Sequence, residues 1–270
     1  MVKNFLEKIR KKYQKISQPA RVNIDAGNFG KEFSNKIKSI DQNYKLKIIT
    51  AYDDNFSKIG DITSKNMRDY SKKFNLEFEK FDLINNNRPP SWSKIQLIKN
   101  EVLKKDNDFI MWVDADAFFP NTANNILKEL DDINEIFLVS HFCEVHKGSR
   151  FKNTLLAINR INCGVLIFRV SDFNVKFLSN VWEKDEYTNH QWWEQAAIMD
   201  LIELKADLTG NLNDQKGNDY YLNKIKFLTK EWNSIPSKQR ISMESVNPSI
   251  VHLAGMNAEE RVAFLKKYNQ

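Results

Sequence analysis

Residues 108–120 read DFIMWVDADAFFP, and this stretch decides the fold class because it joins an apolar run to two carboxylates. The run FIMWV is almost continuously apolar, which is typical of a central parallel strand that is covered on both faces. Asp114 and Asp116 follow it directly, so the strand ends in an Asp-x-Asp motif. Two explanations stay open at this point: the carboxylates hold a metal ion at the end of a buried strand, or they lie in a solvated turn.

The residues before this stretch alternate between strand and helix patterns. Strands are predicted from runs of apolar residues, or from their alternation with charged ones, at residues 43–54 and 76–83. Helices are predicted from helical spacing of apolar residues at 61–75, with Asp61 as candidate N-cap, and at 91–105. This order is that of an α/β sheet with right-handed crossovers. Ligands bind beyond the carboxyl ends of the strands in such sheets, and the Asp-x-Asp motif lies there.

The second half of the chain has a more mixed pattern. Strands are predicted at residues 135–142, at 162–170 and within 248–255, where the strand ends at His252. Helices are predicted at 171–184, capped by Ser171 or Asp172, at 190–204, with Trp193 and Met199 available to the core, and at the C-terminus. Loops are predicted at 146–154 and 212–222. No repeat or clear linker divides the chain, so we expect a single α/β domain.

Three parts are expected within this organisation. Residues 1–42 are predicted to form a basic amphipathic helix and an extension. Residues 43–256 are predicted to form the α/β domain, and residues 257–270 a C-terminal helix that packs on it. The N-terminal helix could lie on an anionic membrane as a peripheral contact, or it could pack on its own domain.

Composition narrows the classes of function. The chain has 270 residues and a formal net charge of +6, which suits an anionic partner such as a nucleotide but equally follows from a Lys- and Asn-rich genome. The two cysteines, Cys143 and Cys163, lack metal-ligand spacing and are expected to be free thiols in a reducing compartment. We see neither an apolar signal core nor an apolar run of membrane-spanning length, so we expect a cytoplasmic protein.

A divalent metal ion would explain the Asp-x-Asp motif. Two carboxylates a few ångströms apart repel each other unless a cation lies between them. Hard oxygen ligands favour Mg²⁺ or Mn²⁺, and substrate phosphates usually complete the coordination shell. His252, at the end of a second predicted strand, would add an imidazole ligand suited to Mn²⁺. The alternative for His252 is a lone core histidine whose ring is satisfied by backbone groups.

Five segments in one order carry a resemblance to a known family. They are RPPSWSKIQLIKNEVL, FIMWVDADAFF, NCGVLIFRVSDFNVKFLSNVW, WWEQAAIMDLI and VHLAGM. Over roughly residues 44–257 the chain resembles the galactosyl-, mannosyl- and xylosyltransferases typified by yeast and plant Golgi enzymes. The resemblance implies a GT-A fold, a mostly parallel sheet flanked by helices, and a retaining, metal-dependent glycosyltransferase. It also implies a nucleotide-sugar donor, with UDP favoured over GDP, and a glycan acceptor.

The resemblance assigns roles to individual residues. Asp114, Asp116 and His252 match the metal ligands, and Glu194 and Gln195 match an acid-Gln pair beside the anomeric carbon. The donor-binding positions that it implies are Thr50, Ala51, Tyr52, Lys94, Asp114, Ala115, Asn162 and Gly164. Thr50 to Tyr52 would hold base and ribose, Lys94 would lie near the donor, and Asn162 and Gly164 would form a turn beneath the sugar. Glu194 is expected to stay ionised, because it lies near the start of a predicted helix.

The sequence departs from the family pattern in two places, and rival functions stay open. Relatives often carry a Lys soon after the metal-ligand His, whereas this chain has Asn257 and then Arg261. The membrane anchor usual in the family is not seen. Glu194 could be a helix-surface charge, or the base of an inverting enzyme. The rival classes are an Asp-x-Asp phosphatase and a non-catalytic nucleic-acid-binding protein. No nucleic-acid-binding motif is recognised, so we expect no nucleic-acid partner.

Overall fold

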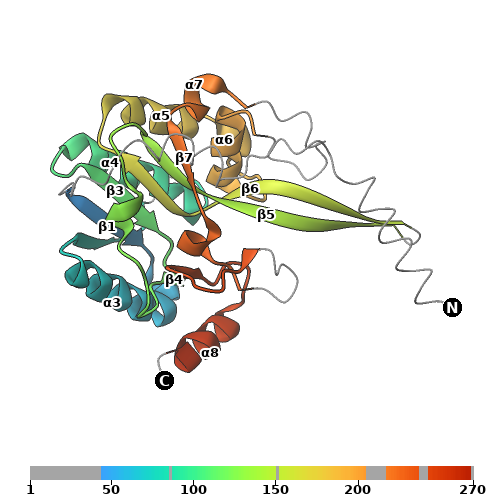
Figure 1. Cartoon of the computed structure of the whole chain (residues 1–270), viewed down its shortest axis with the longest axis horizontal. Helices are drawn as coiled ribbons and strands as arrows, with labels where there is room; N and C mark the ends of the chain where they lie inside the picture. The colour runs from blue at the N-terminus through green and yellow to red at the C-terminus, as the bar shows by residue number, and fades with distance from the viewer. Residues whose placement is uncertain (1–43, 85–86, 150–151, 205–216, 237–242, 269–270) are drawn as a thin grey trace.

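The computed structural model describes residues 44–84, 87–149, 152–204, 217–236 and 243–268, and its centre is a twisted β-sheet with helices on both faces (Figure 1). The strands are β1 (Leu46–Ala51), β2 (Glu77–Phe81), β3 (Phe109–Val113), β4 (Ala117–Phe118), β5 (Ile136–Ser149), β6 (Lys152–Arg169), β7 (Ile225–Leu228) and β8 (Val251–His252). The α-helices are α3 (Ser57–Lys73), α4 (Ser93–Lys104), α5 (Asp172–Trp182), α6 (Trp193–Leu201), α7 (Asp219–Leu222) and α8 (Ala258–Tyr268).

Strand direction in the main sheet is almost uniform. The order is β2-β1-β3-β6-β5-β7, and the pairs β1–β2, β1–β3 and β5–β7 are parallel. Strand β6 is antiparallel to both β3 and β5, so β6 alone in this sheet runs against the others. The predicted α/β class, a mostly parallel sheet in a single domain, is therefore confirmed. The carboxyl ends of β1 and β3 lie side by side at one edge, where the candidate site forms.

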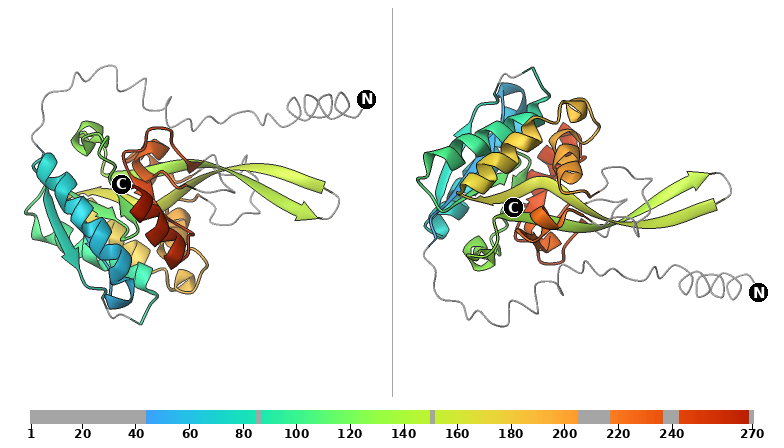
Figure 2. Two further views of the ribbon diagram at one scale, coloured as in Figure 1. Left: turned by 90° about the horizontal axis from the view of Figure 1, so that it is seen from below. Right: turned by 90° about the horizontal axis from the view of Figure 1, so that it is seen from above.

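Alternate residues of the strands face two separate cores, as the pleat requires. On one face, Ile49 and Trp112 pack with Ile95 of α4, in a core that also takes in α5 and α6. On the other face, Ile48 and Met111 pack in a core that includes α3 (Figure 2). A strand buried on both faces needs apolar residues throughout, which is why FIMWV lacks polar interruptions.

Helix α3 begins four residues earlier than predicted. It starts at Ser57, so Asp61 lies within its first turns and does not cap it. A short 3₁₀-helix over Asp54–Phe56 precedes α3, and the side chain of Asp53 caps that segment by accepting from the Phe56 backbone N–H at 3.2 Å. Ser171 caps α5, as one of the two predicted alternatives.

The hairpin of β5 and β6 is much longer than the predicted strands. Its ladder continues to the pair Ser149–Lys152, and all three views show it projecting from the domain as a two-stranded arm (Figures 1 and 2). The prediction of a loop is therefore wrong for residues 146–149 and 152–154, and residues 150–151 lie outside the described residues. Charged and polar residues interrupt the hydrophobic pattern there, whereas the backbone hydrogen bonds of a hairpin do not depend on side chains.

A small second sheet and the helices α7 and α8 complete the described chain. Strand β8 pairs with β4 in a small antiparallel sheet, with Ala117 opposite His252. The prediction of a loop at residues 212–222 is wrong for Asp219–Leu222, which form the short helix α7, capped by Asn218. Leu265 of α8 is buried against Phe118 and Leu253.

The predicted N-terminal helix lies outside the described residues. None of the helices in the described ranges combines the length and the hydrophobicity that crossing a membrane requires.

Candidate active site

A tight turn and one strand pair bring the two aspartates and the histidine together. The Asp114 N–H donates to the Gly164 carbonyl at 2.8 Å, and the Ala117 N–H donates back to the Asp114 carbonyl at 2.9 Å. The chain therefore turns directly after β3 and enters β4, where Ala117 pairs with His252 of β8. One ligand atom from each of Asp114, Asp116 and His252 lies within 4.8 Å of the others. Two carboxylate oxygens and an imidazole nitrogen at this spacing form a donor set suited to Mn²⁺ or Mg²⁺.

The two oxygens of Asp114 have different surroundings. Its Oδ1 accepts hydrogen bonds from Lys94 Nζ at 2.9 Å and from Trp112 Nε1 at 2.6 Å. Its Oδ2 is 3.7 Å from His252 Nε2, which itself lies 3.2 Å from Asp116 Oδ1. The other oxygen of Asp116, Oδ2, is 3.0 Å from Arg261 Nη2 on α8. One oxygen of each aspartate thus faces His252, while the other is held by a cation of the protein.

These contacts govern protonation in the absence of a metal ion. Burial alone would raise the pKa of Asp116, but His252 and Arg261 outweigh it and lower the pKa to about 2. Burial alone would lower the pKa of His252, but Asp116 and Asp114 outweigh it and raise that pKa above its ordinary value. The protein's own positive charges therefore balance two carboxylates where a divalent cation would otherwise do so.

Lys94 joins the metal-site carboxylates to Glu194. Its side chain is 4% exposed, and Nζ lies 2.9 Å from Asp114 Oδ1, 2.8 Å from Glu194 Oε1 and 3.0 Å from the carbonyl oxygen of Cys163. An ammonium group has three hydrogen atoms to donate. All three have acceptors within the protein, so Lys94 links the Asp-x-Asp turn, Glu194 of α6 and the Cys163 backbone of β6 to one another.

Glu194 and Gln195 lie in the first turn of α6 and both face the site. Glu194 is buried beside Lys94, and Gln195 Oε1 accepts from the Cys163 N–H at 3.2 Å. The expectation that a helix start keeps Glu194 ionised needs correction. Burial raises the pKa of Glu194 above its ordinary value, and the main opposing influence is the Lys94 ammonium. The ionisation of Glu194 therefore depends on Lys94 more than on the helix end.

Trp193 is not in the core, contrary to the sequence prediction. Its side chain is 44% exposed, and its backbone φ of 44° lies in the left-handed region that bulky residues rarely adopt. This backbone conformation at the start of α6 turns Trp193 outward, while the following Glu194 is buried. Periodicity alone could not reveal this, because it assumes regular helical geometry.

Asn162 and Gly164 lie within β6, where the Asn162 side chain closes a local turn onto the Gly164 backbone. Ser140 pairs with Ile161 but Leu138 pairs with Leu166, so residues 162–165 form an irregularity in the β5–β6 ladder. Asn162 Oδ1 accepts from the Gly164 N–H at 2.9 Å, which stabilises this local geometry. The irregularity presents residues 162–164 to Lys94, Gln195 and His252.

Gly164 is required by close packing against His252. A Cβ atom at this position would lie 2.2 Å from His252 Cε1 and 2.3 Å from Nδ1. We expect Gly164→Ala to displace the imidazole and to weaken Mn²⁺ binding by at least about tenfold, with an overpacking cost of about 1–3 kcal/mol in stability. Titration of free Mn²⁺ by electron paramagnetic resonance measures the binding.

Gly60→Ala is the matched control for that prediction. A Cβ at Gly60 would lie 2.7 Å from the Tyr52 ring, so the change also overpacks the protein but touches none of the three metal-site residues. It is expected to lower the melting temperature without changing the affinity for Mn²⁺ in the absence of nucleotide. Equal Mn²⁺ affinities in Gly164→Ala and the wild type would contradict the packing argument.

The predicted donor-binding residues Thr50, Ala51 and Tyr52 lie at the carboxyl end of β1 and just beyond it, and β1 pairs in parallel with β3. Thr50, Ala51 and Tyr52 are all buried, and the Tyr52 hydroxyl hydrogen-bonds Asp61 at 2.8 Å and Ser64 at 3.0 Å. The carbonyl of Ala115 accepts from Thr63 Oγ1 at 2.6 Å, which fixes the Asp-x-Asp turn to α3. The donor-binding role of Thr50 to Tyr52 stays a prediction.

Sequence reasoning missed two residues of this network. Trp112 lies two positions before Asp114 in a strand, so alternation places both side chains on the same side of the strand, and that signal was available. Asn233 lies in a short 3₁₀-helix, η6 (Lys230–Asn233), and its side chain contacts both His252 and Asn162. Its segment carries no motif from which this contact could be predicted.

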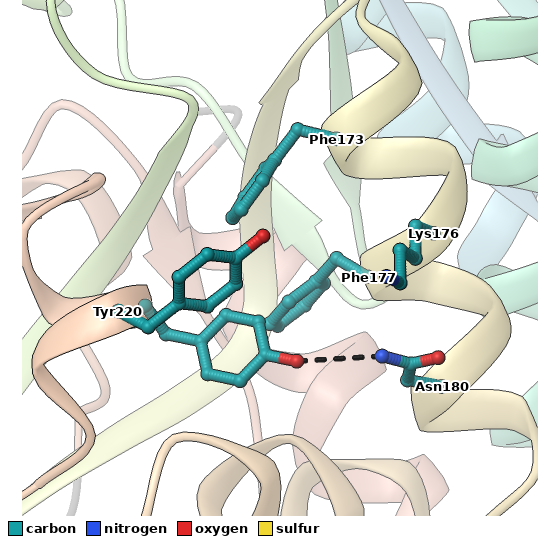
Figure 3. Close-up of a pocket in the computed structure, with 6 residues that line it drawn as sticks. Phe173, Lys176, Phe177, Asn180 and Tyr220 are labelled. Carbon is teal, nitrogen blue, oxygen red and sulfur yellow. Dashed lines mark hydrogen bonds between the residues drawn. The ribbon is translucent and has the colours of Figure 1, made fainter.

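A hollow of about 190 Å³ lies away from this site. It is lined by Phe173, Lys176, Phe177, Asn180, Tyr220 and Tyr221, from α5 and α7, and the Asn180 amide donates to the Tyr221 hydroxyl at 3.3 Å (Figure 3). Strand β6 runs antiparallel to β3, so its last residues lie beside the start of β3, at the opposite end of that strand from Asp114. Helix α5 begins just after β6, so Phe173 lies at that end of the sheet. The hollow therefore shares no residue with the candidate active site.

The fold and the site define a class of protein. A mostly parallel sheet flanked by helices is the GT-A fold of glycosyltransferases that the resemblance implied, and two solved glycosyltransferases share this fold. A glycosyltransferase involved in glycosylation of the major capsid of the virus PBCV-1 superposes with a TM-score of 0.59 at 13% identity, over 83% of this chain and 99% of that one. The galactosyltransferase LgtC, solved with donor and acceptor sugar analogues, superposes with a TM-score of 0.51 at 10% identity, over 83% and 94%. These similarities show the fold.

Sequence comparison gives the family. The chain belongs to the galactosyl transferase GMA12/MNN10 family, whose model matches residues 47–261. It is also 29% identical over 164 residues to an uncharacterized α-1,2-galactosyltransferase of Schizosaccharomyces pombe. That alignment takes in 51% of this chain and 44% of the yeast protein, so the chain spans less than half of the length of this relative.

Proposed function

We propose that this chain is a metal-dependent glycosyltransferase that moves a hexose or pentose from a nucleotide-diphosphate sugar to a glycan acceptor, with retention of anomeric configuration. The observation that carries the proposal is the meeting of Asp114, Asp116 and His252 at the carboxyl edge of the sheet, within 4.8 Å of one another. Family membership supports glycosyl transfer, and galactose is the sugar in the name of the yeast relative.

The donor set fits a divalent ion held by two aspartates and one histidine. Asp114 Oδ2, Asp116 Oδ1 and His252 Nε2 are the atoms that face one another. Bound there with the donor, Mn²⁺ or Mg²⁺ would stabilise the negative charge that develops on the departing diphosphate. The rival Asp-x-Asp phosphatase needs an aspartate free to attack phosphorus. Such phosphatases usually carry the motif after their first strand, whereas here it follows β3, the third strand of the chain.

Glu194 and Gln195 are the residues best placed to act on the sugar. Glu194 Oε1 pairs with Lys94, and its Oε2 is buried and makes no well-formed hydrogen bond in the described part of the chain, with the Ser91 hydroxyl nearby. An unpaired buried carboxylate oxygen is costly, and a hydroxyl of the sugar or the acceptor would satisfy it. Negative charge beside the anomeric carbon also stabilises an oxocarbenium-like transition state. We assume no covalent intermediate, since a second carboxylate at hydrolase-like spacing is needed to argue for one.

A UDP-linked donor is favoured over a GDP-linked one by the family resemblance. The test is a calorimetric titration of the protein with UDP, GDP and CMP, each in the presence and in the absence of Mn²⁺. We expect UDP to bind most tightly and only with Mn²⁺. Binding of CMP with neither UDP nor GDP would overturn the donor assignment, and equal UDP affinity without Mn²⁺ would overturn the metal's role.

The position of Arg261 leads to a second prediction, about the affinities for Mn²⁺ and UDP, which the same calorimetric titration measures. Its guanidinium lies 3.0 Å from Asp116 Oδ2 and therefore competes with a cation for that carboxylate. Arg261→Gln is expected to raise the affinity for Mn²⁺ alone by up to about fivefold, because a partly exposed ion pair is worth about 1 kcal/mol. If the guanidinium moves to the diphosphate when the donor binds, the same variant will bind UDP more weakly at saturating Mn²⁺.

Arg68→Gln controls for the loss of one positive charge. Arg68 is exposed on α3, where its guanidinium lies over the Phe78 ring at 5.6 Å. It should leave both affinities unchanged. A fall in the affinity for Mn²⁺ alone in Arg261→Gln would show that Arg261 supports the metal site and does not compete with it.

A further inference from the structure

Asn233 lies between the histidine of the candidate metal site and the irregular segment of β6. It is fully buried, with 0% of its surface exposed. Its Oδ1 is 2.9 Å from His252 Nδ1, and its Nδ2 donates to Asn162 Oδ1 at 2.9 Å and to the Asn162 carbonyl at 3.1 Å. All the polar atoms of this side chain are therefore engaged by two residues of the site.

The orientation of the Asn233 amide follows from a backbone donor. The Gly164 N–H can only donate, and it lies 2.9 Å from one atom of the Asn162 side-chain amide. That atom must therefore be the oxygen, Oδ1. An oxygen there, together with the Asn162 carbonyl, requires the nitrogen of Asn233 to face Asn162. The oxygen of Asn233 must then face His252, because a flipped amide would set oxygen against two oxygens.

The imidazole orientation follows in turn. With an oxygen 2.9 Å from Nδ1, the Nδ1 atom of His252 must carry a proton and donate it. The lone pair of the neutral ring is then on Nε2, the atom that lies 3.2 Å from Asp116 and 3.7 Å from Asp114. This is the tautomer that a metal ion between the three residues requires.

Backbone contacts keep Asn233 in place relative to His252. The residue after it, Ser234, accepts from the His252 N–H at 2.8 Å and donates from its own N–H to the Ile250 carbonyl at 2.9 Å. Asn233 and His252 are thus on two paired segments, and the distance between their side chains is fixed by main-chain hydrogen bonds.

We infer that Asn233 is a positioning residue that selects the Nδ1–H tautomer of His252 and so presents Nε2 to a divalent cation. The inference rests on the proposed metal site, where outer partners of a ligating histidine orient its ring and fix its tautomer. It adds a residue that acts through His252 without touching metal or substrate.

The first test is the affinity of the nucleotide-free protein for Mn²⁺, measured by electron paramagnetic resonance. Asn233→Leu is expected to weaken binding by about 10- to 100-fold, the usual effect of losing an outer partner of a metal ligand. Asn174→Leu is the matched control. Asn174 is equally buried and bonds the backbone carbonyls of Glu135 and Arg169, so its loss should destabilise the fold without changing Mn²⁺ affinity. Equal affinities in Asn233→Leu and wild type would overturn the inference.

A second measurement, on the wild-type protein, holds even if Asn233→Leu fails to fold. Long-range ¹H–¹⁵N NMR of the Mg²⁺-saturated protein, with His252 assigned by comparison with His252→Gln, should show a proton on Nδ1 and none on Nε2. A proton on Nε2 with Nδ1 unprotonated would overturn the inference.

The same NMR experiment separates this inference from the proposed function. If neither Mn²⁺ nor Mg²⁺ binds to the wild type, the proposed metal site fails. The metal-free protein at acidic pH should still show an Nδ1–H signal of His252 that Asn233 protects from solvent exchange. Rapid exchange of that proton would overturn the role of Asn233 independently of the metal.

Discussion

Replacing Asp116 with Asn is expected to reduce turnover by at least about a hundredfold, because a metal ion contributes several kcal/mol of transition-state charge stabilisation. The amide keeps the shape of the side chain but removes the negative charge that faces His252 Nε2 at 3.2 Å. Asp172→Asn is the control, since Asp172 is an exposed acid at the start of α5 that pairs with Lys105 and with none of the site residues named above. Unchanged turnover of Asp116→Asn at limiting metal would contradict the account.

The same variant has a predicted effect on acid stability. The pKa of Asp116 falls from an ordinary value of 3.8 to about 2 in the metal-free fold. A lowered carboxyl pKa contributes stability above the unfolded pKa, and this contribution is lost as pH falls through the folded pKa. The difference in melting temperature between the wild type and Asp116→Asn should therefore be largest above about pH 4 and should shrink towards pH 2.

Replacing Lys94 with Met is expected to give the largest loss of stability, about 3–5 kcal/mol, because it leaves the buried carboxylate of Glu194 and the partly exposed carboxylate of Asp114 without their shared cation. Lys94 Nζ lies within 2.9 Å of an oxygen of each. Urea unfolding curves measure the loss. Adding Glu194→Gln to the Lys94→Met background should restore part of it, since one uncompensated charge is removed.

Lys105→Met is the matched control for Lys94. Lys105 is also paired with an aspartate, Asp172 at 3.2 Å, but both side chains are exposed. An exposed ion pair is worth less than about 1 kcal/mol, so this variant should unfold almost as the wild type does. Similar losses in the two variants would show that Lys94 does not carry the charge balance of the site.

The sequence correctly predicted that Asp114 and Asp116 follow directly after a buried strand, because the local pattern of apolar and charged residues determines where that strand ends. An apolar strand buried on both faces cannot include Asp114, so the charge marks where the strand leaves the core. The position of His252 also followed from pattern, since a lone polar residue ended a short apolar run. The meeting of the two depends on the β4–β8 pair, which joins residues far apart in the chain. The strand-end pattern suggested it only as the hypothesis of a shared metal ion, and the family resemblance strengthened that hypothesis.

Other features of the site could not be predicted from pattern. Asn233 acts through its position between two distant segments, and its own neighbourhood contains no signal. Trp193 was misplaced because a single left-handed backbone angle at the start of α6 reverses its direction. The long β5–β6 arm was missed because hairpin hydrogen bonds tolerate polar side chains. Pattern thus predicted the edge of the sheet where the site lies, and tertiary contacts determined which groups meet there.

The most direct test of the central claim is incubation of the protein with UDP-galactose and Mn²⁺. Released UDP is measured with time, and the metal is removed by a chelator before ¹H NMR of the first galactose transferred to water. We predict UDP release that needs Mn²⁺ and is lost in Asp116→Asn, with α-galactose formed before mutarotation. β-Galactose as the first product would contradict retention and would make Glu194 the base of an inverting enzyme. UDP release that continues without a divalent ion would contradict the metal-dependent transfer on which the account is built.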